Sequence, residues 1–150
     1  NLLREYIPNV KFTTDVIVGF PGESEEDFLA SCEFVKKAEF LTVHIFPYSK
    51  RAGTPAATMK GQISTEEKSR RLHELEKICQ ENTAKILSRE VAERDEREVL
   101  FETFKDGYAY GHTDDFLEIC VPSERDMRGE IAKVKLISSD GKQIFADLQK

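Results

Sequence analysis

The stretch from Val43 to Ala57 constrains the fold more than any other part of the chain. An apolar, β-branched run ends in an aromatic residue at Phe46 and turns at Pro47. The Gly/Pro-containing loop that follows carries Ser49, Lys50, Arg51 and Thr54. Folds of the α/β class place binding and catalytic groups where a strand ends and presents polar side chains in a loop. We therefore expect a functional site at the end of this strand.

A strand and a helix are predicted before this stretch. Residues 10–20 finish in a continuous apolar run, which is typical of a strand buried on both faces of a parallel sheet. The turn at residues 21–22 ends this strand, and Ser24 is placed as the N-cap of a helix that continues to about residue 40. A second strand is predicted at 41–46. This βαβ unit cannot close a sheet alone, so its neighbouring strands are missing or supplied elsewhere.

A long helix and a run of short strands complete the chain. Ser64 and Glu67 form a capping-box pattern, and the helix is expected to continue to about Ser88. Five strands are then predicted, at residues 98–104, 108–113, 116–121, 129–138 and 143–148. Short strands separated by glycine turns favour a small closed barrel of the OB or SH3-like kind. We predict an α/β domain over residues 1–88 and an all-β barrel domain over residues 89–150.

Composition restricts the partners. The net charge is −6, and residues 89–150 hold 10 Lys and Arg against 15 Asp and Glu, a net charge of −5. RNA binding would therefore depend on local positive charges and on stacking, and not on electrostatic attraction between RNA and the net charge of the protein. No apolar run reaches the roughly 20 residues of a membrane span, and no signal peptide is present, so a cytoplasmic protein without a membrane partner is expected. Because the chain begins at Asn1 without Met, we expect a segment of a longer protein.

The cysteines and the histidine of the second strand do not indicate a metal site. Cys32, Cys79 and Cys120 lie 47 and 41 residues apart (79−32 and 120−79) and have no CxxC neighbour. This spacing matches no zinc or iron–sulfur signature, so reduced and mostly buried thiols are expected. His44 alternates with apolar residues and is more typical of an ordinary sheet histidine than of a ligand.

Three groups of residues are candidates for binding, and each has an ordinary structural alternative. Gly19–Glu23 is neither GxGxxG nor a Walker loop; it allows a ligand close to the backbone, or is a plain βα turn. Lys50 and Arg51, in the loop after the second predicted strand, are suited to bind phosphate or carboxylate, or are ordinary solvated surface residues. The period of two places Tyr108, Tyr110 and His112 on one face, where they form a stacking platform for bases or part of the core.

Two stretches resemble a known family. Residues 14–28 resemble a late strand and turn of radical S-adenosylmethionine enzymes. Residues 44–59, HIFPYSKRAGTPAATM, resemble the methylthiotransferases, and most closely the branch that acts on N6-threonylcarbamoyladenosine in tRNA. Residues 89–150 are similar to a TRAM domain, an RNA-binding or substrate-binding barrel. The resemblance implies the C-terminal part of a radical S-adenosylmethionine (β/α) barrel followed by a TRAM domain.

The resemblance also implies cofactors and partners. The full protein would hold S-adenosylmethionine and two [4Fe-4S] clusters, act on the anticodon stem-loop of tRNA and receive electrons from a donor. No CxxxCxxC loop is present, so the segment alone is expected to be inactive and to hold neither a catalytic residue nor a metal ligand. Two alternatives stay open: a noncatalytic RNA-binding adaptor, and a methylthiotransferase that acts on a ribosomal protein.

The resemblance assigns roles to particular positions. Those expected at the cofactor are Ile17, Gly19, Gly22 and Glu23. Those expected at RNA or substrate are Ser49, Lys50, Arg51, Thr54, Tyr108, Tyr110 and His112. Three positions depart from the family pattern: Asp15 stands where a glycine is usual, Glu23 lies one place late, and His112 replaces an arginine.

Overall fold

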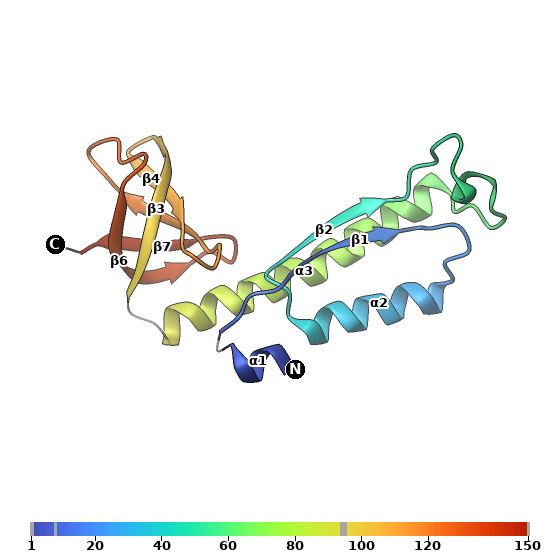
Figure 1. Ribbon diagram of the computed structural model, residues 1–150, viewed down its shortest axis with the longest axis horizontal. Helices are drawn as coiled ribbons and strands as arrows, with labels where there is room; N and C mark the ends of the chain where they lie inside the picture. Colours follow the sequence, from blue (N-terminus) through green and yellow to red (C-terminus); the bar gives the residue numbers. More distant parts are fainter. Residues whose placement is uncertain (1, 8, 94–95, 150) are drawn as a thin grey trace. The chain divides into compact units, whose positions relative to one another are not determined.

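The computed structural model describes residues 2–7, 9–93 and 96–149 (Figure 1). The chain divides into two compact units, one from Phe12 to Asn82 and the other formed by the segment up to Lys11 with the chain from Thr83 onward. The elements are α1 (Leu2–Tyr6), β1 (Thr13–Val18), α2 (Glu25–Ala38), β2 (Thr42–Pro47), the 3-10 helix η1 (Pro55–Thr58), α3 (Thr65–Glu93), β3 (Glu96–Lys105), β4 (Tyr108–His112), β5 (Glu118–Pro122), β6 (Ile131–Ser139) and β7 (Ile144–Leu148). The predicted α/β segment and five-stranded barrel are both confirmed.

The first of these units is built on a parallel pair of strands, β1 and β2. α2 begins with the predicted cap: the Ser24 hydroxyl accepts a hydrogen bond from the Asp27 N–H, and the Asp27 carboxylate accepts one from the Ser24 N–H. The buried core joins the strands to α2 and α3 through Val18, Phe28, Cys32, Val35 and Leu75. The apolar residues of one sheet face therefore meet the helices.

The other face of this sheet is not covered by the described residues. Its side chains form cross-strand neighbours, among them Asp15 beside His44 and Ile17 beside Phe46. Ile17 is 53% exposed and Phe46 is 52% exposed. The prediction of a strand buried on both faces is therefore wrong for the described chain, because each strand pairs only with the other and the helices pack on one side.

α3 is the longest element and contributes residues to both units. The Ser64 hydroxyl accepts a hydrogen bond from the Glu67 N–H at 3.1 Å, as the cap pattern predicted. The helix continues five residues beyond the predicted end at Ser88 and is about 44 Å long. Its last turns are fixed by Glu90, a buried carboxylate that binds Lys11 and Arg97. No helix among the described residues is both long and apolar enough to cross a membrane.

Five strands form a closed barrel in the order β3-β4-β5-β7-β6. All of its pairings are antiparallel except the short parallel contact between β5 and β7. Apolar side chains that alternate along the strands fill the core, among them Val99, Phe101, Ile119, Val134 and Ile144. Phe116, predicted to begin a strand, instead lies in a turn at φ 64° and is 77% exposed.

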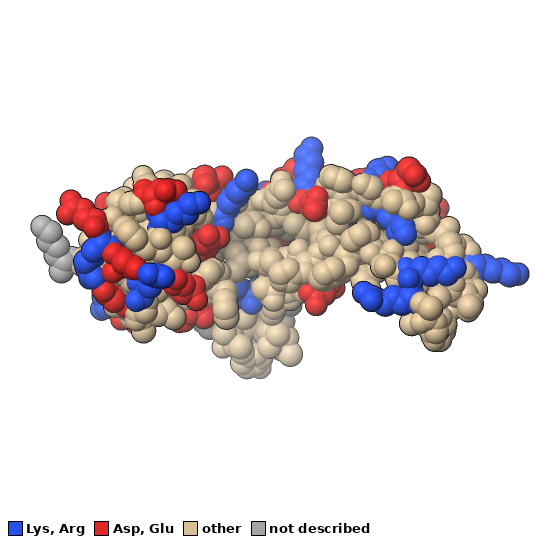
Figure 2. Space-filling model, turned by 90° about the horizontal axis from the view of Figure 1, so that it is seen from above, with Lys and Arg blue, Asp and Glu red and all other residues tan. Residues whose placement is uncertain are grey.

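Charge is distributed differently over the two units. On the barrel, Figure 2 shows Lys and Arg side chains interspersed with Asp and Glu, as expected from its composition. The loop between β2 and α3 carries Lys50, Arg51 and Lys60 and no acidic residue. This loop is therefore locally positive within a chain that is acidic as a whole.

Candidate functional site

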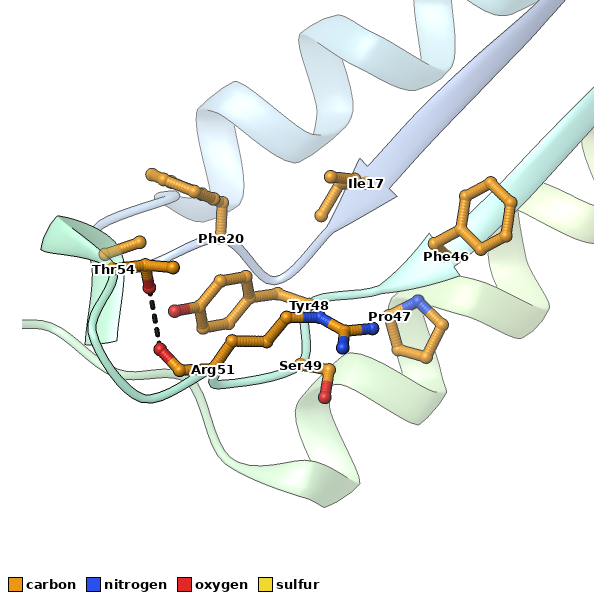
Figure 3. A pocket seen from close by; sticks show the side chains of 9 residues that line it. Ile17, Phe20, Phe46, Pro47, Tyr48, Ser49, Arg51 and Thr54 are labelled. Atoms are coloured by element: carbon orange, nitrogen blue, oxygen red, sulfur yellow. Dashed lines mark hydrogen bonds between the residues drawn. The ribbon is translucent and has the colours of Figure 1, made fainter.

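The carboxyl ends of β1 and β2 lie side by side and open into a cavity of about 470 Å³. The two strands are parallel and in register, with Val18 beside Pro47, so the segments after both strands leave the sheet at one edge. Open α/β sheets bind ligands at this edge. The cavity is lined by Ile17, Phe20, Phe46, Pro47, Tyr48, Ser49, Arg51, Thr54 and Ala56 (Figure 3).

The structure brings part of the predicted site together. Ile17 from the predicted cofactor group lines the same cavity as Ser49, Arg51 and Thr54 from the predicted substrate group. Seven predicted residues do not line this cavity: Gly19, Gly22, Glu23 and Lys50 from the same unit, and Tyr108, Tyr110 and His112 from the barrel. Sequence reasoning missed the aromatic walls formed by Phe20, Phe46 and Tyr48. Their position at the two strand ends was the available signal, since each stands within two residues of a strand terminus.

The turn after β1 is shaped by contacts within the protein. Gly19 has a φ of 71°, and a Cβ there would lie 2.2 Å from the Lys68 Cγ, so glycine lets α3 approach closely. Gly22 has a φ of 89°, and its N–H donates to the Gly61 carbonyl at 2.9 Å. The two glycines thus join this turn to the chain that leads into α3.

Glu23 binds groups of the protein itself. Its carboxylate accepts hydrogen bonds from the Gly19 N–H at 2.6 Å and from Arg71 Nη1 at 2.5 Å. Arg71 is nearly buried and also binds Glu67 at 2.8 Å. Burial by itself would lower the pKa of Arg71, but the bonds to Glu23 and Glu67 raise it. The carboxylate of Glu23 therefore links the turn to α3.

Hydrogen bonds also hold the loop after β2. The Tyr48 N–H donates to the Val18 carbonyl at 2.8 Å, and Lys68 Nζ donates to the Tyr48 carbonyl at 3.0 Å. The Thr54 hydroxyl donates to the Arg51 carbonyl at 2.8 Å, the bond drawn in Figure 3. These bonds place the polar groups of the loop at the cavity.

The three predicted barrel residues share an outward face of β4. Tyr108 is 39% exposed, Tyr110 is half-buried and His112 is exposed, whereas Ala109 and Gly111 between them face the core. The tyrosine ring centroids are 6.4 Å apart. The ring Nδ1 of His112 lies 2.6 Å from the carboxylate of Glu102. The arrangement provides two neighbouring rings on the barrel surface.

The cysteines are not placed as a cluster site. Cys32 and Cys120 are buried, and Cys79 is half-buried. Burial raises the pKa of Cys79 to about 11, and burial also raises the pKa of the other two thiols. In the described ranges, no group of three His, Cys, Asp or Glu side chains is arranged to hold a metal ion. The residues present do not fit an iron–sulfur cluster.

Comparison with known proteins identifies the class of protein. No protein-family model matches the chain. Relatives at 36–41% identity over more than nine tenths of the chain are tRNA-modifying enzymes that add a methylthio group, as their names state. Over nearly all of its length, the chain is therefore homologous to the methylthiotransferases of the radical S-adenosylmethionine class. This confirms the resemblance found in residues 14–28 and 44–59.

The names of individual relatives contain two different modified nucleosides. The threonylcarbamoyladenosine tRNA methylthiotransferase MtaB of Bacillus subtilis is 38% identical over 142 residues, which are 93% of this chain and 32% of the relative. The tRNA-2-methylthio-N(6)-dimethylallyladenosine synthase of Aquifex aeolicus is 41% identical over 140 residues, 91% of this chain and 31% of the relative. The synthase of the same name from Carboxydothermus hydrogenoformans is 55% identical over 73 residues, 49% of this chain and 17% of the relative. The chain spans about one third of the length of the Bacillus subtilis and Aquifex aeolicus relatives.

Proposed function

We propose that the chain is a segment of a tRNA methylthiotransferase that replaces the C2 hydrogen of N6-threonylcarbamoyladenosine, next to the anticodon, with a methylthio group. Homology to methylthiotransferases supports the reaction class, and the name of the Bacillus subtilis relative supports the nucleoside. The segment would complete the S-adenosylmethionine pocket and contact RNA. The cytoplasm, where tRNA is modified, is the proposed location.

The cavity at the strand ends is the observation that carries the proposal. Its walls are mainly apolar and aromatic, with Ile17, Phe20 and Phe46 suited to the flat face of an adenine, so the lining fits an adenosine-containing cofactor or substrate. Ile17 is the predicted cofactor residue that would contact the base. Gly19, Gly22 and Glu23 would act on that pocket by holding the turn beside it.

The chemistry itself requires groups outside this segment. S-adenosylmethionine, when bound beside a reduced [4Fe-4S] cluster, supplies the radical chemistry that an unactivated carbon–hydrogen bond needs. The described cysteines do not fit either cluster of the family. The ligands of both clusters and the site for an electron donor are therefore assigned to the remainder of the protein. The residues of this chain would bind and orient the cofactor and the nucleoside and exclude water from them.

RNA contact is proposed at two places. The loop cations Lys50 and Arg51 would meet phosphate, and the exposed ring of Tyr108 with the half-buried ring of Tyr110 would stack on bases. His112 lies beside Glu102, so that position offers RNA less positive charge than an arginine would. The barrel is thus proposed to bind by stacking more than by charge.

The test is nucleoside analysis of tRNA after incubation with the full protein that contains this chain. The protein is reconstituted with iron and sulfide and supplied with S-adenosylmethionine and a reductant. Substrates are a tRNA with threonylcarbamoyladenosine, a tRNA with dimethylallyladenosine and a ribosomal protein. We expect mass spectrometry to show a methylthio group on the first. Methylthiolation of either other substrate alone would refute the assignment.

The second candidate, a noncatalytic RNA-binding adaptor, is favoured by one observation. The outward tyrosines of β4 form a surface that needs no cofactor. RNA binding by the barrel without methylthio transfer by the full protein would support the adaptor over the enzyme.

A further inference from the structure

A group of buried charges has no role in the function proposed so far. It consists of Lys11, Glu90, Arg97 and Asp115, and we call it the buried charge cluster. The exposed fractions of the Lys11, Glu90 and Arg97 side chains are 11%, 5% and 7%, and that of Asp115 is 24%. Because its two cations and two anions pair with one another, the cluster acts through the segments that it connects and not through a ligand.

Each member comes from a different segment of the unit that contains the barrel. Lys11 lies in the segment before β1, Glu90 in the last turns of α3, Arg97 on β3 and Asp115 in the turn between β4 and β5. One oxygen of Glu90 pairs with Lys11 Nζ, and the other accepts a hydrogen bond from Arg97 Nη1 at 3.1 Å. Arg97 Nη2 also pairs with Asp115, whose Oδ2 lies 3.9 Å from Lys11 Nζ. The contacts therefore form a closed ring through all four segments.

The anion on the barrel side of this ring is fixed by its neighbours. The Asp115 carboxylate accepts hydrogen bonds from the Thr113 hydroxyl at 2.7 Å and from Arg97. Burial by itself would raise the pKa of Asp115, but the bonds from Thr113 and Arg97 lower it below its ordinary value. Arg97 also binds Asp114 at 3.1 Å, but that side chain is 95% exposed to water. Arg97 is therefore held between one charged group of the barrel and one of α3.

The buried charge cluster connects the barrel to both segments that lead to the other unit. The chain passes between the units after Lys11 and again after Asn82, within α3. The barrel also meets α3 at the turn between β6 and β7, where a Cβ on Gly141 would lie 3.1 Å from the Ala84 Cβ. That contact joins two small residues and contains no directional bond, whereas the pairs of the buried charge cluster are directional.

Buried ion pairs are better suited to fix an arrangement than to add stability. Removing charges from water costs about as much as their pairing returns, so apolar residues of similar size are often equally stable. An apolar contact tolerates a small shift, but a displaced charge loses its partner while it stays buried. Any shift of the barrel away from α3 or from the segment before β1 would therefore leave a buried charge unpaired.

We propose that Glu90 and Arg97 are positioning residues for RNA: through the buried charge cluster they hold the barrel in one orientation on α3 and on the segment before β1. The inference rests on the proposed function, in which RNA contacts both the barrel and the loop after β2. Two contacts at a fixed spacing strengthen each other, because the second forms at a high effective concentration, and a barrel free to turn would lose that gain. The buried charge cluster thus raises the affinity for RNA without touching it.

The test measures binding of tRNA to the full protein that contains this chain. Fluorescence anisotropy with a labelled tRNA gives the Kd, and thermal unfolding gives the Tm. Glu90→Leu/Arg97→Leu replaces the central pair by apolar residues and leaves Lys11 beside Asp115. We expect a Tm close to that of the wild type and a Kd about tenfold higher. Arg125→Leu/Glu130→Leu is the matched control, since it removes an exposed ion pair of the barrel and should change neither value.

The loss of affinity should also depend on the RNA-binding surface of the barrel. In a Tyr108→Ala/Tyr110→Ala background the barrel contact is already lost, so we expect Glu90→Leu/Arg97→Leu to cause no further loss. A purely structural role would give the same loss in both backgrounds. Lys11→Gln is a milder second variant, because Glu90 keeps its bond to Arg97, and it should raise the Kd about threefold.

Two results would overturn the inference alone. One is a wild type that binds tRNA and an unchanged Kd for both Glu90→Leu/Arg97→Leu and Lys11→Gln. The other is a loss of the same size with and without the two tyrosines. If Glu90→Leu/Arg97→Leu lowers the Tm markedly, the same comparisons made with Lys11→Gln decide the question. A wild-type protein that binds no tRNA would refute the proposed function together with the inference.

Discussion

Glu23 shows how one side chain connects two distant parts of the chain. Its carboxylate pairs with Arg71, which lies 48 residues later, and also accepts a hydrogen bond from the Gly19 N–H. The exposed fractions of the Glu23 and Arg71 side chains are 13% and 5%, so water screens this pair only weakly. The conformation of the glycine turn therefore depends on a residue of α3.

Replacing Glu23 tests this connection. We expect Glu23→Gln to lower the free energy of unfolding by about 1–3 kcal/mol, because the buried guanidinium of Arg71 loses an anionic partner. Urea unfolding followed by circular dichroism measures the loss. Glu26→Gln is the control, since Glu26 is an exposed carboxylate nearby on α2. Equal urea midpoints for the two variants would show that the pair does not stabilise the fold.

Glu67 gives the chain an acid-sensitive contact. Hydrogen bonds from Arg70 and then Arg71 lower the pKa of Glu67 from 4.5 to about 2. As the pH falls, the Glu67 carboxylate therefore takes up a proton at a higher pH in the unfolded chain than in the folded chain. The stability that Glu67 contributes is complete above pH 4.5 and is lost as the pH falls toward 2. The free-energy difference between wild type and Glu67→Gln should thus shrink over this range in urea titrations. A difference that stays constant with pH would contradict the expectation.

At the scale of elements, α2 begins with a complete capping box. Ser24 and Asp27 exchange hydrogen bonds at 3.1 Å and 3.0 Å, and the three acidic residues of the first turn are Glu25, Glu26 and Asp27. Side-chain caps satisfy backbone N–H groups that the helix itself leaves unpaired. This local signal places the start of the helix immediately after the glycine turn.

Removing the cap should destabilise α2 specifically. We expect Ser24→Ala to lower the free energy of unfolding by about 1 kcal/mol. Ser31→Ala in the same helix is the matched control: its hydroxyl only binds the Asp27 carbonyl within the helix, and alanine favours helix, so little loss is expected. Urea unfolding followed by circular dichroism compares the two. A larger loss for Ser31→Ala than for Ser24→Ala would refute the role of the cap.

At the scale of the whole molecule, the chain carries an incompletely covered sheet. Among the described residues β1 and β2 pair only with each other, although parallel strands are normally buried on both faces. Ile17 and Phe46 lie side by side on the uncovered face. Such a face, with its unpaired strand edges, favours association with other surfaces.

The isolated chain should therefore self-associate. We expect sedimentation velocity to show species larger than 17.2 kDa, and the Ile17→Thr/Phe46→Thr double variant to shift the chain toward the monomer. Ile137→Thr serves as control because Ile137 is 51% exposed on β6, outside this face. A wild-type chain that is monomeric at high concentration would favour the stand-alone adaptor instead.

Local patterns were enough to predict the elements, the family and part of the site. The cap at Ser24, the alternation along the barrel strands and the motif around Arg51 each depend on residues close in sequence, and the structure and the homologues confirm the elements and the family. The division of the chain at residue 88 and the roles of the site residues stay predictions.

Tertiary structure alone decided which groups meet. The partner of Glu23 is 48 residues away, and the exposure of Ile17 depends on which elements cover the sheet. Whether the buried Tyr48 hydroxyl finds a hydrogen-bond partner among the described residues depends on all the atoms packed around it. Periodicity and caps arise from neighbours within a few residues, whereas burial and pairing arise from contacts between distant segments. The sequence therefore determined where strands and helices form, and only the packed fold determined which side chains remain for a ligand.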